Sequence, residues 1–323
     1  MPAFDLLVAG EINPDLILSG DVEPAFGQVE KLVEAAALTI GSSSAIFACG
    51  AARLGLRVAF VGLCGDDVFG RFMLEAMQQR GVDTRSVIVR SGEQTGLSVI
   101  LNRGADRAIL TYPGLIPALQ SEDVPDSLLR QARHLHVASY FLQTSLQPGL
   151  PGLFSRARAL GLTTSLDTNW DPSGSWRGLE DLWPHTNVFL PNAAECLAIV
   201  NPSILVVGAD GVRPDSLRPD AVELAARKLA ARVDVLAVKL GAQGALGLQG
   251  AANLTRVASI PVQVVDTVGA GDSFDAGFIF GYLSGWELEK CLRLGVVCGA
   301  LSTQAAGGVA GQPALAQALE FLP

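Results

Sequence analysis

The stretch from Val262 to Leu283 constrains the fold of this chain more than any other. It opens with a β-branched run, Val262–Val265, passes through the turn residues 266–268 and reaches Gly269-Ala270-Gly271-Asp272. After these, apolar residues recur at helical spacing: Phe274, Phe278, Ile279, Tyr282 and Leu283. We therefore predict an extended segment, a tight turn and a helix that begins near Gly271.

The predicted turn has a chemical consequence. A helix N-terminus leaves backbone N–H groups without partners and carries partial positive charge. The small residues Gly269, Ala270 and Gly271 let an anion approach those amides, as a transferring phosphoryl group requires. Asp272 would lie beside that anion, where a carboxylate can take a proton from an attacking hydroxyl. The alternative is that Asp272 only caps the helix and the glycines only form a turn.

Composition excludes several classes of protein. The chain has 323 residues, of which 49% are hydrophobic and 17% charged, so it can bury a large core. A net charge of −9 argues against a nucleic-acid or anionic-membrane partner. The start, MPAFDLLVAG, lacks the basic region of a signal peptide, and no apolar run is long enough to span a membrane. Five cysteines without metal-type spacing predict reduced thiols and a cytoplasmic protein.

Strands and helices alternate from residue 134 onward, which predicts a parallel sheet covered by helices on both faces. The predicted strands are 134–138, 163–167, 187–190, 235–240 and pieces between 244 and 265. Earlier in the chain, residues 13–40 and three alternating runs within 86–112 predict a small separate sheet, with the three runs forming a meander. Ligands of open parallel sheets bind at the carboxyl ends of the strands. Polar groups follow three predicted strands there: Asp167–Asp171, Asn192–Glu195 and Lys239–Gly244.

The segment DTVGAGD (266–272) resembles the signature D-T-x-G-A-G-D of the ribokinase / phosphofructokinase-B (PfkB) carbohydrate kinases. Other motifs of that family occur in the same order along the whole chain. The first predicted strand continues as G-x-x-N-x-D at Gly10, Asn13 and Asp15, and N-x-x-E and L-G-x-x-G follow at 192–195 and 240–244. The resemblance implies one doubly wound α/β domain over residues 1–323, with segments 13–40 and 86–112 forming a β-sheet lid.

The resemblance also implies ATP, Mg²⁺ and a small sugar as ligands, and it assigns roles to individual residues. Asp272 would be the general base and the amides of 269–271 the anion hole. The substrate-binding residues would be Asn13, Asp15, Gly41, Ser42 and, in the lid, Arg103. The nucleotide-binding residues would be Asn192, Lys239, Gly241, Gly244 and Gly308. Glu195 would organise water around Mg²⁺, and Asp266 and Val268 would help to hold a monovalent cation such as K⁺.

The chain departs from the family pattern mainly at the sugar motifs. Ser42 replaces the second glycine of G-G-x-x-x-N, Ile46 replaces its asparagine, and Asp171 replaces the arginine of D-x-N-x-R. These changes put ribose in doubt and leave a nucleoside or a sugar phosphate open as acceptor, and a non-catalytic sensor as a further alternative. We expect a neutral sugar to be preferred, because Asp15 would repel a phosphate and no arginine or lysine lies near Gly41 in the sequence. The exposed edges of the lid predict a homodimer paired through it.

Overall fold

A nine-stranded sheet forms the centre of the structure, a computed structural model that describes residues 2–103, 106–204, 207–208, 211–212, 217–250 and 253–322. The strand order across the sheet is β17 (Asn253–Val257), β16 (Ala245–Gln249), β15 (Val235–Lys239), β12 (Val188–Phe189), β11 (Thr163–Leu166), β10 (His134–Val137), β1 (Leu6–Ala9), β4 (Val58–Val61) and β6 (Val82–Asp83). All neighbours from β15 to β6 pair in parallel, and β16 pairs antiparallel with both β15 and β17. The doubly wound α/β architecture is thus confirmed.

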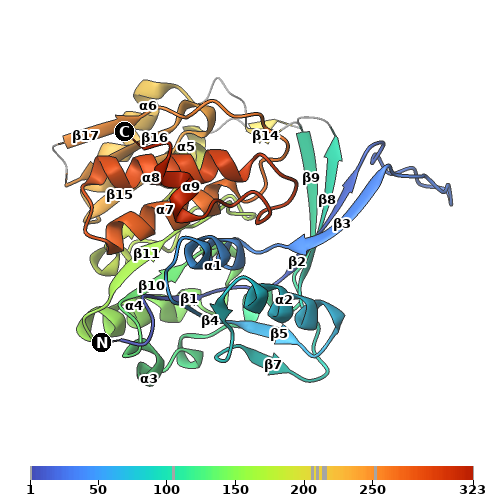
Figure 1. Ribbon diagram of the computed structural model, residues 1–323, viewed down its shortest axis with the longest axis horizontal. Coiled ribbons are helices and arrows are strands. Elements are labelled where there is room, and N and C mark those ends of the chain that lie inside the picture. Colours follow the sequence, from blue (N-terminus) through green and yellow to red (C-terminus); the bar gives the residue numbers. More distant parts are fainter. Residues whose placement is uncertain are drawn as a thin grey trace.

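Helices cover both faces of this sheet (Figure 1). One layer contains α1 (Ser43–Arg53), α2 (Val68–Gln79), α7 (Ala270–Leu283), α8 (Leu288–Ser302) and α9 (Leu315–Leu319). The other contains α3 (Asp126–Leu129), α4 (Leu150–Ala159), α5 (Ala193–Val200) and α6 (Pro219–Ala230). Along β1, Leu6 and Val8 face the first layer while Leu7 and Ala9 face the second, because successive side chains of a strand point to opposite faces. Two apolar cores therefore hold the sheet between them.

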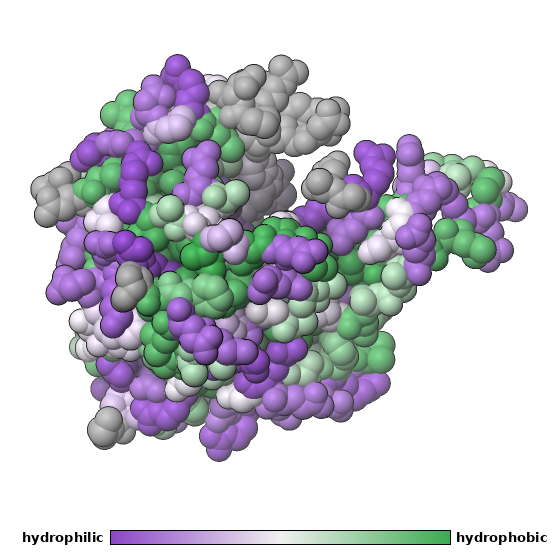
Figure 2. Space-filling model, turned by 45° about the horizontal axis from the view of Figure 1, so that its top comes forward, coloured by the Kyte–Doolittle hydropathy of each residue, from purple (hydrophilic) through white to green (hydrophobic). Residues whose placement is uncertain are grey.

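A second sheet of four strands projects from one side of the body (Figure 1). Its order is β3 (Ala35–Ile40), β2 (Pro14–Ser19), β8 (Leu97–Arg103) and β9 (Asp106–Tyr112). These strands lie within the two segments for which the sequence predicts a small sheet. The segment between β2 and β3 extends beyond the sheet and has a mixed hydrophobic and hydrophilic surface (Figure 2), with Phe26 and Leu32 exposed at 95% and 84%.

The predicted meander of residues 86–112 is wrong in two respects. Its first run forms β7 (Ile88–Arg90), which pairs in parallel with β5 (Leu63–Gly65) in a separate two-stranded sheet. The other two runs form the hairpin β8–β9, but β8 also pairs in parallel with β2. Alternation of apolar and polar residues predicts that a strand exists but does not predict which strand it pairs with. Here the partner of β8 is β2, which lies about 80 residues earlier in the chain.

One further segment differs from its prediction, and another lies partly outside the described residues. Residues 258–266 contain no strand, although Val262–Val265 is β-branched, and Val264 and Val265 are exposed. The proline-rich segment 200–220 contains the short strands β13 (Val207–Gly208) and β14 (Gly211–Val212), and residues 205–206, 209–210 and 213–216 lie outside the described part. No helix in the described ranges combines the length and apolar character that a membrane span needs.

Candidate active site

Polar side chains gather at the carboxyl edge of the central sheet, where its parallel strands end together. Glu11 follows β1, Ser139 follows β10, and Asp167 follows β11. Asn192 follows β12, and Lys239 is the last residue of β15. Because β4 pairs with one side of β1 and β10 with the other, this edge also lies at the switch point where ligands of open α/β sheets bind.

Helix α7 begins at this edge with the predicted turn. Gly269 precedes the helix with a φ of +71°, a left-handed conformation that favours glycine. A Cβ on Gly269 would lie 2.7 Å from the Cα of Gly308, and one on Gly308 would lie 2.4 Å from the Cδ1 of Ile46. The structure thus brings Gly269 and Gly308 together, with Ile46 packed against their backbone in place of the family's asparagine. The first amides of α7 form a small-residue N-terminus that an anion can approach.

Asp272 lies in the first turn of α7 and is only 8% exposed. Burial raises the pKa of this carboxyl to about 7, an effect that nearby Asp167 increases and Lys239 opposes. A hydrogen bond from Ser43 also stabilises its charge, and Asn169 Nδ2 donates to the Ser43 hydroxyl over 2.9 Å. Gly269 is the N-cap residue of α7, and no side chain caps the helix there. Asp272 is buried, and its pKa is raised into the range that suits a general base.

A largely buried cation, Lys239, lies between two fully buried carboxylates at the centre of the edge. The Lys239 Nζ lies 2.7 Å from Asp167 Oδ2 and 3.0 Å from Asp275 Oδ2. Burial raises the pKa of Asp275, whereas the three acids Asp167, Asp275 and Glu195 raise the pKa of Lys239. Among the residues that the structure describes, none forms a hydrogen bond with Asp275 Oδ1. The sequence places Lys239 only in the nucleotide motif, and it gives one signal for Asp275: an acid one turn after Asp272 on the buried helix.

Asn192 and Glu195 bond to each other at the start of α5. The Asn192 backbone N–H and Nδ2 donate to the Glu195 carboxylate over 2.8 and 2.6 Å, and the Glu195 N–H donates to Asn192 Oδ1 over 3.0 Å. This capping box satisfies the helix N-terminus. Burial raises the pKa of Glu195 to about 8, and nearby Asp167 adds to the effect. The pair therefore has a structural role at this position in addition to any role toward a ligand.

The donor set fits Mg²⁺. Carboxylate oxygens of Asp167, Asp272 and Asp275 lie within 4.8 Å of one another, and all three residues are buried. Oxygen ligands of this kind suit Mg²⁺, and the unpartnered Asp275 Oδ1 leaves a further acceptor in the cluster. Burial also raises the pKa of Asp272 and Asp275, so additional positive charge would stabilise their ionised forms.

A cavity of about 610 Å³ opens beside the α7 N-terminus. Its wall includes Lys239, Gly241, Gly244, Ala270 and Gly271. A Cβ on Gly244, whose φ is +94°, would lie 2.0 Å from the Val257 carbonyl oxygen, so this turn requires glycine. Apolar residues from the segment 260–264 and from α8 complete the wall. The cavity has the size of a small-molecule site and places the predicted nucleotide turn beside the anion hole.

Asn13 and Asp15 lie where β1 continues into β2, and both are buried. Asn13 Nδ2 donates to the Ser98 hydroxyl over 3.3 Å. A Cβ on Gly41 would lie 2.1 Å from Asp15 Oδ1, so the glycine lets the carboxylate lie against its backbone. Burial raises the pKa of Asp15 to about 7, while the nearby charge of Arg107 lowers it.

Ser42 has a φ of +65°, a backbone conformation that glycine adopts more readily than serine. Its hydroxyl donates to the Glu11 carbonyl over 2.7 Å and accepts from the Ala45 N–H over 3.0 Å, which caps α1. The buried Glu11 carboxylate also accepts hydrogen bonds from Ser44 and Ser139. The sequence analysis did not single out Glu11 as a site residue. Two features of the sequence could have indicated it: its position directly after the first strand, and the three consecutive serines at 42–44 that can donate to a carboxylate.

The structure does not bring Arg103 to this cluster. Arg103 is the last residue of β8, and its guanidinium lies 3.7 Å from the Glu23 carboxylate. Asp15 pairs with Ser98, near the other end of that strand. Arg107 on β9 instead reaches Thr267, with 3.5 Å between Nη1 and Oγ1.

Asp171 accepts hydrogen bonds from residues 173–176 and so forms a local turn. Asp266 accepts the backbone N–H groups of Val268 and Gly307 over 3.0 and 2.9 Å, which joins two loops.

The small-residue start of α7, buried Asp272, a small-molecule cavity and buried Asp15 on the projecting sheet together form one candidate active site. Residues 4–315 match the family described as pfkB family carbohydrate kinase. A relative named uncharacterized sugar kinase from Archaeoglobus fulgidus is 30% identical over 269 residues, covering 82% of this chain and 98% of that protein. The 5-dehydro-2-deoxygluconokinase of Geobacillus kaustophilus is 28% identical over 290 residues, covering 88% and 84%.

Solved structures share the fold over nearly the full length. A putative ribokinase II from E. coli in complex with ATP and Mg²⁺ has a TM-score of 0.81 at 22% identity, covering 99% of both chains. The adenosine kinase of Sinorhizobium meliloti has a TM-score of 0.82 at 24% identity, covering 98% of this chain and 99% of that one. At these identities the likeness concerns the fold alone. The chain belongs to the pfkB family of carbohydrate kinases, and it is an enzyme of that class.

Proposed function

We propose that this enzyme transfers the γ-phosphoryl group of ATP to a hydroxyl of a small sugar, with Asp272 as general base. The observation that carries the proposal is the position of Asp272, buried in the first turn of α7 with its pKa raised to about 7. A base with a pKa near the working pH combines a large ionised fraction with adequate basicity. The ATP complex of a fold neighbour supports the choice of nucleotide.

The proposed step proceeds as follows. The acceptor oxygen attacks the γ-phosphorus and loses its proton to an Asp272 oxygen, while the bond from that phosphorus to the β–γ bridging oxygen breaks. The N–H groups of Gly269 and Gly271 would donate to the oxygens of the transferring group, and that of Ala270 would do so after leaving the Thr267 carbonyl, to which it donates over 3.3 Å. Such donors typically contribute about 2.7–4 kcal/mol each to a barrier. The nucleotide occupies the cavity formed by residues 239–244, the segment 260–264 and α8, with its phosphates at the α7 N-terminus.

Several residues would serve the cation and the nucleotide without taking part in proton transfer. Glu195, with Asn192, would orient water around Mg²⁺. The carboxylates of Asp167 and Asp275, whose oxygens lie within 4.8 Å of each other and of Asp272, would accept hydrogen bonds from that water. Mg²⁺ supplies positive charge that neutralises the phosphate oxygens. Asp266 and Val268 would hold a K⁺ ion where Asp266 joins the loops at 266–268 and 307.

The acceptor would lie between Asp15 and Asp272. Asp15 and Asn13 offer hydrogen-bond partners to hydroxyl groups, and Gly41 and Ser42 form the adjoining wall. Arg107 is the cation nearest to Asp15, and one guanidinium suits a neutral sugar or a sugar acid better than a phosphosugar, which normally needs a cluster of cations. The names of relatives such as 5-dehydro-2-deoxygluconokinase also favour a small deoxysugar derivative.

An acceptor panel tests the function directly. We expect transfer from ATP to at least one free hexose, pentose or ketodeoxy sugar acid, with kcat/KM at least about tenfold above that of any phosphorylated counterpart, equivalent to about 1.4 kcal/mol. A nucleoside as the best acceptor would favour the nucleoside-kinase alternative. ATP binding without phosphorylation of any acceptor would leave a non-catalytic sensor as the function.

The pH dependence follows from two raised pKa values. Asp15 and Asp272 each have a pKa raised to about 7, so both are increasingly protonated as the pH falls below that value. We expect log kcat/KM to fall with a slope approaching two on the acid side in the wild-type enzyme. The Asp15→Asn variant removes one titrating group, and its slope should be one. A profile that stays flat down to about pH 5 would exclude both ionisations.

We also propose that the small sheet acts as a lid and pairs with that of a second copy. Its outer strands β3 and β9 carry exposed Leu38, Ile109 and Leu110, with exposed fractions of 41%, 53% and 60%. Unpaired edges and apolar side chains of this kind are normally covered. Sedimentation at micromolar concentration should show a dimer, and a monomer alone would refute the pairing.

Five free buried cysteines support a reducing, cytoplasmic location.

A further inference from the structure

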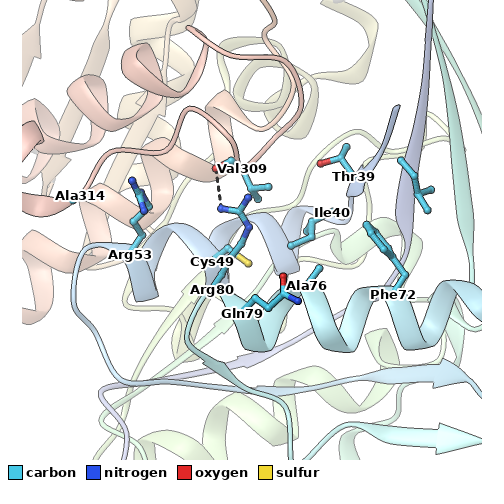
Figure 3. Close-up of a pocket in the computed structure, with 11 residues that line it drawn as sticks. Thr39, Ile40, Cys49, Arg53, Phe72, Ala76, Gln79, Arg80, Val309 and Ala314 are labelled. Carbon is cyan, nitrogen blue, oxygen red and sulfur yellow. Dashed lines mark hydrogen bonds between the residues drawn. The ribbon is translucent and has the colours of Figure 1, made fainter. Parts of the chain in front are cut away.

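Figure 3 shows a second cavity, of about 570 Å³. It is lined by α1, by α2 and the residue after it, by the end of β3 and by the segment 309–314. None of its lining residues lines the nucleotide cavity. Nothing in the proposed reaction uses it, although its size falls in the range of small-molecule sites.

Two arginines are the charged groups among the described residues that line this cavity, and the chain as a whole has a net charge of −9. Arg53 at the end of α1 and Arg80 at the end of α2 both extend toward the segment 309–314 (Figure 3). Arg53 Nε donates to the Gln312 carbonyl over 2.6 Å, and Arg80 Nη1 donates to the Val309 carbonyl over 3.2 Å. Within the described ranges neither guanidinium pairs with a carboxylate, so each is held in place with other N–H groups available.

We propose that this cavity binds a small phosphate monoester. Two guanidinium groups match the charge of a phosphate dianion, and their planar arrays of donors suit its oxygens. The other lining residues are mixed: apolar Leu38, Ile40 and Phe72 suit a short organic group attached to the phosphate, and polar Thr39 and Gln79 suit its hydroxyl groups. A nucleic acid is excluded as the occupant, because two cations in one cavity of an acidic protein cannot follow a polyphosphate backbone.

The cavity shares a wall with the proposed active site. Val309, whose carbonyl accepts from Arg80, directly follows Gly308, which lies against Gly269 at the anion hole. Gln312, held by Arg53, donates through Nε2 to the Ser273 hydroxyl on α7 over 3.1 Å and to the Ile46 carbonyl over 2.9 Å. The segment 308–312 therefore contacts the proposed phosphate site on one side and the start of α7 on the other.

Isothermal titration calorimetry on the full chain tests the proposal, with sn-glycerol 3-phosphate as the probe and inorganic phosphate and glycerol as comparison arms. The protein is first saturated with a non-hydrolysable ATP analogue and Mg²⁺, so that the anion hole is filled. We expect one equivalent of glycerol 3-phosphate to bind, with weaker binding of inorganic phosphate and none of glycerol. Equal affinity for the ester and for inorganic phosphate would overturn the organic part of the proposal.

Variants separate this cavity from other anion sites. Arg53→Gln combined with Arg80→Gln should weaken binding at least about tenfold, while the affinity for the ATP analogue stays unchanged. Ala76→Glu keeps both arginines and places a carboxylate in the cavity, so it should weaken binding equally even if the double variant is unstable. Arg71→Gln, on an exposed part of α2, is the matched control and should bind like the wild type. No binding by the wild type, or an equal loss in Arg71→Gln, would refute the site.

Discussion

Replacing Asp272 with asparagine should lower turnover by roughly 10²–10⁴-fold, the usual contribution of a general base, while leaving the affinity for ATP nearly unchanged. The carboxamide keeps the volume of the side chain but cannot take the acceptor's proton. Initial rates with a saturating acceptor, together with ATP-analogue titrations, measure the two effects separately. Near-wild-type turnover would reduce Asp272 to a helix-capping residue.

The same substitution should stabilise the folded protein at high pH. The pKa of Asp272 is raised from 3.8 to about 7 in the folded state, so stability falls as the pH rises from 3.8, where the unfolded chain ionises, and the loss is complete above about 7. A shift of this size corresponds to roughly 4 kcal/mol, present above about pH 7 and absent below the unfolded pKa. Thermal unfolding of Asp272→Asn at about pH 8 should therefore show a higher midpoint than the wild type, and the difference should shrink near pH 4. Asp220→Asn, in the exposed first turn of α6, is the matched control and should show neither effect.

Lys239→Met should be the most destabilising single substitution considered for this site. It leaves the buried Asp167 and Asp275 carboxylates without the cation that lies 2.7 and 3.0 Å from them. Breaking a buried ion pair from one side typically costs about 3–5 kcal/mol. Denaturant unfolding at neutral pH measures the loss, and Lys228→Met on the exposed face of α6 should change stability by less than about 0.5 kcal/mol.

A second variant tests the cause of that loss. Adding Asp275→Asn to Lys239→Met removes one of the two uncompensated charges, so the double variant should recover part of the stability. If the double variant is less stable than Lys239→Met by the full cost of a separate lesion, the two residues act independently and the ion-pair explanation fails.

Much of the fold follows from local sequence patterns. Alternating strands and helices after residue 134 predict the parallel sheet, and the small residues 269–271 predict the start of α7. Where the prediction failed, the missing information was non-local. The run at 88–90 alternates like a strand of the small sheet, but its partner is β5, and only the packed structure decides between such partners.

The proposed site divides in the same way. Gly269 and Asp272 share the start of α7 because a helix start fixes its own first residues, and Gly308 lies against Gly269 because glycine permits close approach. Glu11 and Asp275 were missed because their importance lies in burial and in partners from distant segments: serines at 42, 44 and 139 for one, and Lys239 for the other. Arg103 shows the opposite case. It lies in the segment predicted to form the lid, but at the end of β8 that is far from Asp15, where its guanidinium is 3.7 Å from Glu23.

The path of the chain from β1 into β2 has a consequence for fidelity. Asp15 belongs to the projecting sheet, whereas Asp272 and the amides of 269–271 belong to the body. On the proposed function, a sugar held by Asp15 would bridge the two parts and bring its own hydroxyl to the base. Water would make no such bridge. The division of the two acids between the small sheet and helix α7 of the body would thus disfavour wasteful hydrolysis of ATP when the sugar is absent.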